Sequence, residues 1–255
     1  MVEVAVDKVL AFVELELRRL RHDPTEVFTR AVQPALWIGV FGTVMSRVRA
    51  IPTGSVDYLT FIAPGVLMQS TSFIAIAYGI MLVWERDSGI LKRVLTLPVN
   101  RFLIVLGRSL SGATRALSQL FVVLLIALPL GARLNVNPLA LCLAALAVYV
   151  CSTGLTALSI IMASAMKTRE RFMGIIQAIT MPLFFTSNAL YPVEFMPQPL
   201  QYVSLFNPLT YTIQALRASL IYCDYWSTLA NTGILATFSL AMLLAATAAL
   251  PRIIE

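Results

Sequence analysis

The stretch WERDSGILKRVLTLPVNR, residues 84–101, is the largest polar segment between two long apolar blocks of the chain. Its charged side chains surround a short apolar stripe: Glu85, Arg86, Asp87, Lys92, Arg93 and Arg101. This spacing predicts a short amphipathic helix that lies on a membrane surface. On this interpretation, a protein outside the chain binds the helix and pushes on it.

The composition on either side of that segment is typical of a membrane protein. Of the 255 residues, 58% are hydrophobic and only 13% are charged, whereas soluble domains carry about 25% charged residues. Several apolar runs approach or exceed the roughly 20 residues that a helix needs to cross a hydrocarbon core. The runs lack the alternation of barrel strands, so helices must satisfy the backbone inside lipid. We therefore predict an all-α integral membrane protein.

Six transmembrane helices are predicted, at residues 27–45, 58–83, 109–130, 138–166, 172–190 and 228–250. We expect Pro64-Gly65 to interrupt the second span. Residues 1–23 predict a cytoplasmic interfacial helix, because their charged side chains fall on one helical stripe. Residues 24–255 then form one six-span domain. Within it, four prolines divide residues 191–225 into pieces too short to span, which predicts a re-entrant segment before the last span.

The distribution of basic residues predicts the orientation. With the N-terminus inside, 15 of the 19 Lys and Arg residues face the cytoplasm, and the exceptions are Arg47, Arg49, Arg133 and Arg217. The positive-inside rule then places both termini on the cytoplasmic side of the cell's inner (plasma) membrane. Segments 84–101 and 167–171 face the cytoplasm, and 191–225 faces outward. The net charge of +6 reflects this bias, and we expect no nucleic-acid partner.

Several kinds of chemistry have no residues to support them. The sequence has no GxxxxGK[ST] loop, so we do not expect an enzyme that hydrolyses ATP by that route. Its single histidine, His22, precedes the first span, which argues against a histidine-based intramembrane protease. Its three cysteines show no metal-type spacing, so no cofactor or metal is expected on this chain. Between Ser88 and Arg169 there is no Asp or Glu, which disfavours an ion-coupled carrier.

Three segments in order resemble one family. Glu85-Arg86, Gly89, Leu91, Leu95, Pro98 and Arg101 resemble the cytoplasmic loop of ABC type-2 transporter permeases. The continuation IVLGRSLSGATRALSQ at 104–119 is similar too, as is the segment 167–211 with its Asn207-Pro208-Leu209-Thr210-Tyr211. The nearest branch contains daunorubicin-resistance and nodulation-factor exporters. The resemblance covers residues 84–217, and the six-span layout covers the whole chain.

The resemblance implies the permease subunit of an ATP-driven exporter for an amphipathic or lipophilic compound such as a drug, lipid or glycolipid. Two permease subunits, identical or homologous, would face each other in the bilayer and dock two cytoplasmic ABC ATPase subunits, which would bind ATP and Mg. The segment 84–101 would be the coupling helix, seated in a cleft of the ATPase. Its candidate contact residues are Glu85, Arg86, Asp87, Gly89, Leu91, Lys92, Arg93, Pro98 and Arg101.

Each of the other candidate groups has both a functional and a structural interpretation. A second cytoplasmic turn, Lys167, Arg169, Glu170 and Arg171, either touches the same ATPase or is an ordinary solvated turn. Polar residues within spans either line a substrate pathway or join helices: Gln33, Gln69, Ser70, Thr71, Gln119 and Gln177. The outer stretch forms either a gate or a lid packed on the bundle, with Tyr191, Pro192, Glu194, Asn207 and Pro208 as its candidates.

Arg101, Arg108 and Arg115 follow one another by sevens and so share one helix face. Snorkelling to headgroups is the usual explanation for such residues, and steering of an anionic, lipid-like substrate is the alternative. Two other function classes also stay open for the whole chain. They are an ion-coupled secondary carrier and a membrane scaffold that transports nothing.

Overall fold

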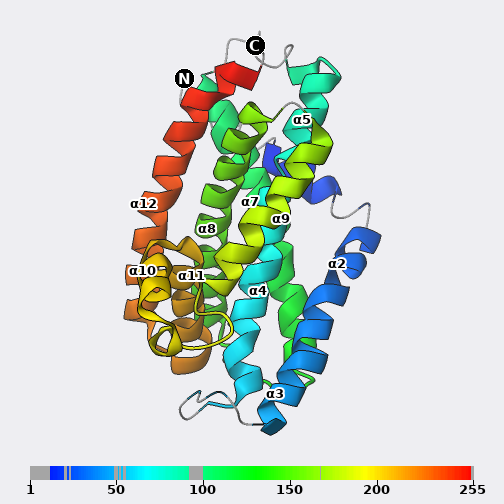
Figure 1. Ribbon diagram of the computed structural model, residues 1–255. Helices are drawn as coiled ribbons and strands as arrows, with labels where there is room; N and C mark the ends of the chain where they lie inside the picture. Colours follow the sequence, from blue (N-terminus) through cyan, green and yellow to red (C-terminus); the bar gives the residue numbers. More distant parts are fainter. Residues whose placement is uncertain are drawn as a thin grey trace.

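The computed structural model describes residues 12–19, 22, 24–48, 51, 53, 56–91, 100–166 and 168–253, and the regular structure in this part of the chain is helical (Figure 1). After a helical segment at 12–19, the elements follow one another as a bundle of long helices with shorter pieces between them. In chain order they are α2 (Pro24–Leu36), η1 (Trp37–Gly42), α3 (Thr43–Val48), α4 (Tyr58–Ala77), α5 (Ile80–Asp87), α7 (Arg101–Ala127), α8 (Pro138–Ala165), α9 (Arg169–Phe185), η2 (Val193–Phe195), α10 (Gln198–Phe206), α11 (Pro208–Arg217), η3 (Ala218–Tyr222), α12 (Tyr225–Ala249) and η4 (Leu250–Ile253).

Four helical segments of the described chain are long and apolar enough to cross a membrane: Tyr58–Asp87, Arg101–Ala127, Pro138–Ala165 and Tyr225–Ala249. The prediction of an all-α fold is therefore confirmed for the described residues, and these four segments have the length and composition of membrane spans. The helical run 24–48 and the 17-residue α9 occupy the places of the other two expected spans, and the count of six stays a prediction. At nine and ten residues, α10 and α11 are too short to span. Their re-entrant placement also stays a prediction.

Side-chain caps fix several helix starts. The Asn100 side chain accepts a hydrogen bond from Phe102 N at 3.0 Å, so α7 begins at Arg101, earlier than the expected start at 109. Asn137 caps α8 in the same way, with Pro138 in the first turn. Asp224 caps α12, and the hydrogen bonds that Ser227 donates hold the pKa of this carboxyl below its usual value. The first turn of each of these helices therefore finds a partner outside the helix backbone.

The expected interruption of the second span at Pro64-Gly65 is wrong. Helix α4 runs unbroken through Pro64, and the chain turns instead at Tyr78 and Gly79, between α4 and α5. A proline weakens hydrogen bonding to carbonyls in the turn before it, and here Arg217 donates to Phe61 O at 3.2 and 3.4 Å. The neighbouring side chain thus offsets part of the cost, as is common in membrane helices.

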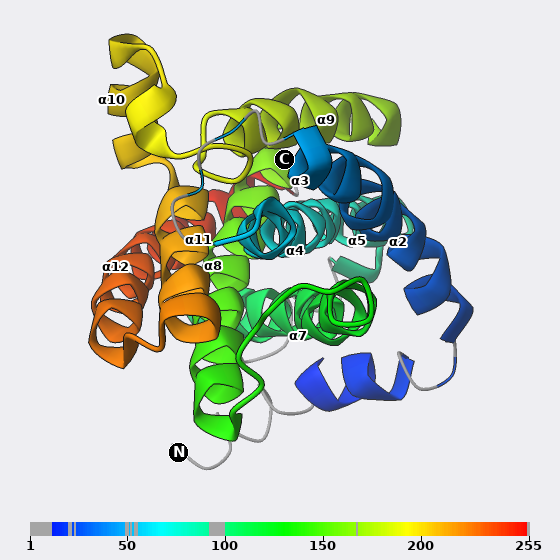
Figure 2. The same ribbon diagram turned by 90° about the horizontal axis from the view of Figure 1, so that it is seen from below.

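Helix α4 is the centre of the bundle. Apart from Phe73 and Ala77, all its 20 residues are buried, and the view along the bundle shows α2 with α3, α7, α8, α9 and α11 around it (Figure 2). Gly65 lets the segment after α9 approach closely, because a Cβ at this position would lie 2.7 Å from Ala189 O. Membrane helices commonly use small residues for such approaches, since lipid supplies no hydrophobic drive between helices.

One element of the first helical run departs from α geometry. Residues 37–42 form the π-helix η1, whose wider turns lie between α2 and α3 without a break in the helix. Trp37, at its start, packs edge-on against Phe41 and against Phe184 of α9, with ring centroids 5.2 and 5.7 Å apart. The π segment therefore lies where the first helical run contacts α9.

The two ends of the bundle differ in charge. We call the end that holds residues 84–91, 100–101, 166 and 168–171 the charged end, and the short C-terminal turn η4 lies there too (Figure 1). The opposite end holds the end of α3 and the turns that follow α7 and η3 (Figure 1). Residues 12–19 are helical, residues 1–11 lie outside the described part, and the interfacial placement of this segment stays a prediction.

The close packing at Gly65 gives a test of the fold. Gly65→Ala should lower the thermal unfolding midpoint of the purified protein, because the methyl group overlaps Ala189 and overpacking costs about 1–3 kcal/mol. Gly174→Ala, also inside a helix, is the matched control, since a Cβ there meets nothing within 4 Å. That change should leave the midpoint unchanged or raise it. Equal midpoints for the two variants would contradict this packing.

Candidate functional site

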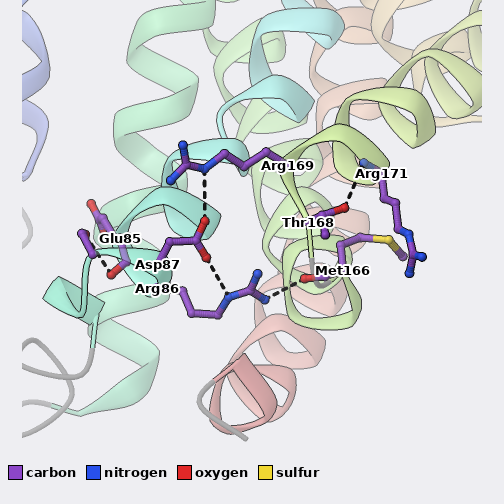
Figure 3. Close-up of polar contacts among 8 residues, drawn as sticks. Glu85, Arg86, Asp87, Met166, Thr168, Arg169 and Arg171 are labelled. Carbon is purple, nitrogen blue, oxygen red and sulfur yellow. Dashed lines mark hydrogen bonds and ion pairs between the residues drawn. The ribbon is translucent and has the colours of Figure 1, made fainter.

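The two polar segments of the charged end are joined by direct contacts (Figure 3). Asp87, in the last turn of α5, accepts a hydrogen bond from Arg169 Nε at 3.1 Å. Its other carboxylate oxygen lies 3.6 Å from Arg86 Nε, and Arg86 donates to Met166 O at 2.6 Å. The Arg169 guanidinium also lies 4.1 Å from the centre of the Trp84 ring. Segments about 80 residues apart therefore share one polar surface.

Local chain geometry places these side chains. Gly89 has φ +72°, a conformation that favours glycine, and it ends α5 just after Asp87. Thr168 caps α9, with its hydroxyl accepting from Arg171 N at 3.4 Å. The exposed Glu170 follows in the first turn, where an acid suits the helix dipole.

The prediction of a separate surface helix over 84–101 is wrong for its first residues. Residues 84–87 form the last turn of α5, because the helix continues to Asp87 before Gly89 breaks it. Ile90 and Leu91 are helical again, the former exposed and the latter buried. Arg101, exposed, begins α7. Lys92, Arg93, Pro98 and Lys167 lie outside the described residues.

Two further ion pairs lie deeper, on α7. Arg108 is 2.5 Å from a Glu85 carboxylate oxygen, and the two side chains are 8% and 23% exposed. Arg115 lies 3.3 Å from Glu16 of the N-terminal helical segment, which is 1% exposed. Arg108 also lies over the Phe12 ring, 5.8 Å from its centre. These pairs fasten both α5 and residues 12–19 to one face of α7.

The α7 pairs differ from what the sequence suggested. Snorkelling predicts guanidinium groups that reach toward headgroups, but Arg108 is buried because Glu85 meets it inside the protein. Glu16 is a functional candidate that sequence reasoning missed. One feature of the sequence points to such a residue. Helix α7 contains no acid that can pair with Arg108 and Arg115, so any acidic partner must come from another segment.

The candidate pathway residues separate into two groups. Gln69 of α4 and Gln177 of α9 line one cavity of about 100 Å³, together with Gln33 of α2. The remaining lining residues are Ser72, Phe73, Thr180, Met181, Phe184 and Leu209. Gln69 is 8% exposed, and its side-chain oxygen has no hydrogen-bond partner in the described structure. A buried polar atom without a partner is unusual in a folded protein.

Ser70, Thr71 and Gln119 do not line this cavity. The hydroxyl groups of Ser70 and Thr71 donate to Val66 O and Leu67 O, one turn back in their own helix, at 3.1 and 3.0 Å. Gln119 is fully buried within the packing of α7. For these three residues the geometry favours a packing role over contact with a substrate at this cavity.

The outer candidates pack onto the bundle. The Asn207 amide donates to Leu183 O at 2.6 Å and to Thr186 at 3.0 Å, while its oxygen accepts from Leu209 N. Pro208 follows in the first turn of α11. Tyr191 donates to Phe185 O at 2.9 Å, Pro192 precedes η2, and Glu194 is exposed. These contacts fit a lid fastened to the end of α9, and its action as a gate stays a prediction.

Arg217 is a second residue whose surroundings the sequence does not predict. Its place on the outward side of the membrane stays a prediction, and in the structure its side chain is 6% exposed. Its guanidinium donates to Phe61 O, Asn188 O and Ala189 O, and lies 3.6 Å from the centre of the Phe61 ring. No carboxylate of the described residues pairs with it. Backbone carbonyls instead hold this cation between α4, α11 and the segment after α9.

Comparison with known proteins identifies the family. Residues 8–221 match the family model of the ABC-2 type transporter. The ycf38 protein of Cyanophora paradoxa, named as a transport permease, is 30% identical over 201 residues, covering 78% of this chain and 69% of the relative. Its counterpart from Porphyra purpurea is 26% identical over 215 residues, 83% of this chain and 73% of the relative.

A further relative is named for drug resistance. The daunorubicin resistance ABC transporter permease protein DrrB1 of Streptomyces coeruleorubidus is 24% identical over 213 residues, covering 84% of this chain and 75% of the relative. The chain belongs to the ABC-2 type transporter family, which confirms the resemblance seen in its polar segments.

The buried pair on α7 gives a stability test. Glu85→Gln should leave Arg108 buried without a countercharge and lower stability by about 3 kcal/mol or more. Glu14→Gln makes the same chemical change in an exposed pair with Arg18 and should cost at most about 1 kcal/mol. Thermal unfolding of both variants checks this. The double change Glu85→Gln with Arg108→Met should recover part of the loss, and equal midpoints for the two single variants would contradict the assignment.

Proposed function

We propose that this member of the ABC-2 type transporter family is the membrane-spanning permease subunit of an ATP-driven exporter. In this proposal two permease subunits, either two copies or this chain and a homologue, face each other in the inner membrane. Cytoplasmic ABC ATPase subunits bind ATP and Mg and dock at the charged end. This chain moves the cargo and the partner hydrolyses ATP, in keeping with the absence of a GxxxxGK[ST] phosphate-binding loop from this sequence.

The observation that carries the proposal is the hydrogen bond between Asp87 and Arg169, which joins the two polar segments. Asp87 ends α5, which follows α4 after a single turn, and Arg169 begins α9. A displacement applied to this surface would therefore act on α4 and α9 together. These two helices supply Gln69 and Gln177 to the cavity, so the docking surface and the proposed substrate path are parts of the same helices.

The contacts revise which residues the ATPase would touch. Glu85 and Asp87 are engaged inside the chain, so they hold the surface in shape rather than pair with the partner. The side chains that face outward from this surface include Trp84, 55% exposed, and Ile90, 49% exposed. Exposed apolar and aromatic side chains at a polar rim are typical of protein interfaces. We assign the direct ATPase contact to them and to Arg101.

The proposed orientation follows from charge. The charged end holds Arg86, Arg101, Arg169 and Arg171, and by the positive-inside rule we assign it to the cytoplasm. The opposite end and the outer stretch 191–225 then face outward. Export is favoured by the relative named for daunorubicin resistance, and an amphipathic or lipophilic cargo suits a cavity lined by apolar side chains and amides.

Docking is tested by matched substitutions at the two ends. Ile90→Asp should reduce co-purification of the ATPase at least tenfold, because it buries a charge in an apolar contact. Val136→Asp changes a side chain of similar exposure, 53%, at the opposite end and should leave binding unchanged. ATP-dependent uptake into inside-out vesicles should fail with the first variant only. Uptake driven by an ion gradient without ATP would indicate a carrier, and no uptake of any compound would favour a scaffold.

Labelling of cysteines tests the orientation. In a Cys142→Ser background, the exposed Cys223 at the opposite end should react with a membrane-impermeant maleimide added to intact cells. A cysteine introduced by Ser88→Cys should react only after the membrane is permeabilised, since Ser88 is exposed at the charged end. Cys151 is buried and should stay unlabelled in both cases. Reaction of the Ser88→Cys variant in intact cells would overturn the proposed topology.

A further inference from the structure

The cavity between α2, α4 and α9 presents oxygen atoms whose lone pairs are free. Ser72 Oγ donates its proton to Met68 O at 2.5 Å, and Thr180 Oγ1 donates to Ile176 O at 2.7 Å. A hydroxyl has one proton to give, so each now offers only acceptor capacity to the cavity. Gln69 Oε1 is buried and receives no hydrogen bond from the described residues. The lining thus contributes three acceptors from two helices.

The charge of the lining further restricts the kinds of ligand that the cavity can bind. The described residues around the cavity include no Asp, Glu, Lys or Arg. An ammonium ion would be desolvated there without a countercharge, which is costly. An anion would likewise be desolvated there without a countercharge, and it would also meet the lone pairs of Gln69 Oε1, Ser72 and Thr180. A neutral group with O–H or N–H donors satisfies these acceptors at no such cost.

The size and the walls of the cavity indicate which part of a ligand enters. About 100 Å³ exceeds the 10–15 Å³ that one water needs, yet it is well below the roughly 300–1,000 Å³ of a site that encloses a whole drug-sized ligand. Phe73, Met181, Phe184 and Leu209 supply apolar wall, and Met181, Gln33 and Gln177 are exposed at its mouth. A polar head would sit inside while an apolar body extends along the helices.

From these features we infer that the cavity binds the neutral, hydroxyl-bearing head of an amphiphile, such as a sugar on an apolar body. The inference rests on the proposed function, because it names the cargo class for the path formed by α2, α4 and α9. Gln69 is the specificity-determining residue, since its buried oxygen gains a partner only when a donor enters. Gln33 and Gln177, at the mouth, adjust their amides to either a donor or an acceptor.

Trp37 provides an optical readout of this site. Its ring packs against Phe184, a lining residue, at 5.7 Å. The full chain in lipid nanodiscs, without any ATPase, is titrated below micellar concentrations with octyl glucoside, its tetra-O-methyl ether, octyltrimethylammonium or octyl sulfate. The tryptophan emission change should report binding, and Trp37→Phe should abolish it. We expect octyl glucoside to bind at least tenfold more tightly than each of the other three probes.

Substitutions decide whether Gln69 is responsible. Gln69→Leu should weaken octyl glucoside binding roughly five- to tenfold, the effect of one hydrogen bond, and should leave binding of the methyl ether unchanged. Gln119→Leu is the matched control, because the polar atoms of that amide are also buried without a partner among the described residues, but the side chain does not line this cavity. Ser72→Ala removes a second acceptor with little change in volume and should also weaken binding, which keeps the test valid if Gln69→Leu does not fold.

The outcomes separate this inference from the proposed function. Equal affinity for octyl glucoside and its methyl ether, tighter binding of the ammonium or sulfate probe, or wild-type affinity in both Gln69→Leu and Ser72→Ala would overturn it. Binding as expected without ATP-driven transport would leave the inference standing and count against the exporter proposal. ATP-driven transport without selectivity for hydroxyl donors would support the exporter proposal and overturn the inference about the cavity.

Discussion

A polar side chain within the apolar part of this bundle has no bulk water to bind, so it must find its partner in the protein. Serine and threonine hydroxyls meet this constraint locally by donating to carbonyls of their own helices, as Ser70 and Thr71 do. An arginine side chain is long and charged, and among the described residues the buried arginines of this bundle are not paired within their own helical turn. Arg108 therefore meets Glu85, Arg115 meets Glu16, and Arg217 meets the carbonyls of Phe61, Asn188 and Ala189. Each contact joins segments that are remote in sequence.

Buried polar groups that have no partner in the protein are informative, because something else must supply the missing hydrogen bond. The side-chain oxygen of Gln69 and both polar atoms of the Gln119 amide are buried and lack partners in the described structure. Gln69 lines the cavity between α2, α4 and α9, where an incoming molecule can supply the missing donor. The charged end illustrates the opposite case, in which Asp87, Arg86 and Arg169 are mutually engaged. Its acids shape a surface, and exposed neighbours such as Trp84 remain to meet a partner.

Much of the fold could be predicted from local sequence. Hydrophobic runs predicted the long helices, Asn137-Pro138 predicted the start of α8, and the motifs around residues 84–101 predicted the family. Contacts between remote segments could not be predicted. Pro64 does not interrupt α4, since Arg217 and Ala189 pack on the same turn, and Glu85 is engaged by Arg108 from α7. These outcomes depend on which helices lie side by side, which periodicity does not encode.

The π-helix at residues 37–42 has a consequence for evolution of the chain by insertion and deletion. Its wide turns accommodate a surplus residue relative to α geometry. Loss of a single codon here would let the segment tighten into a regular helix and swing everything before it by about 100° relative to α3. Gln33 would leave the cavity while α4 and α9 kept their own amides in place. The same change would separate α2 and residues 12–19 from α7, so it would alter the lining of the cavity only at the cost of contacts such as the Arg115–Glu16 pair.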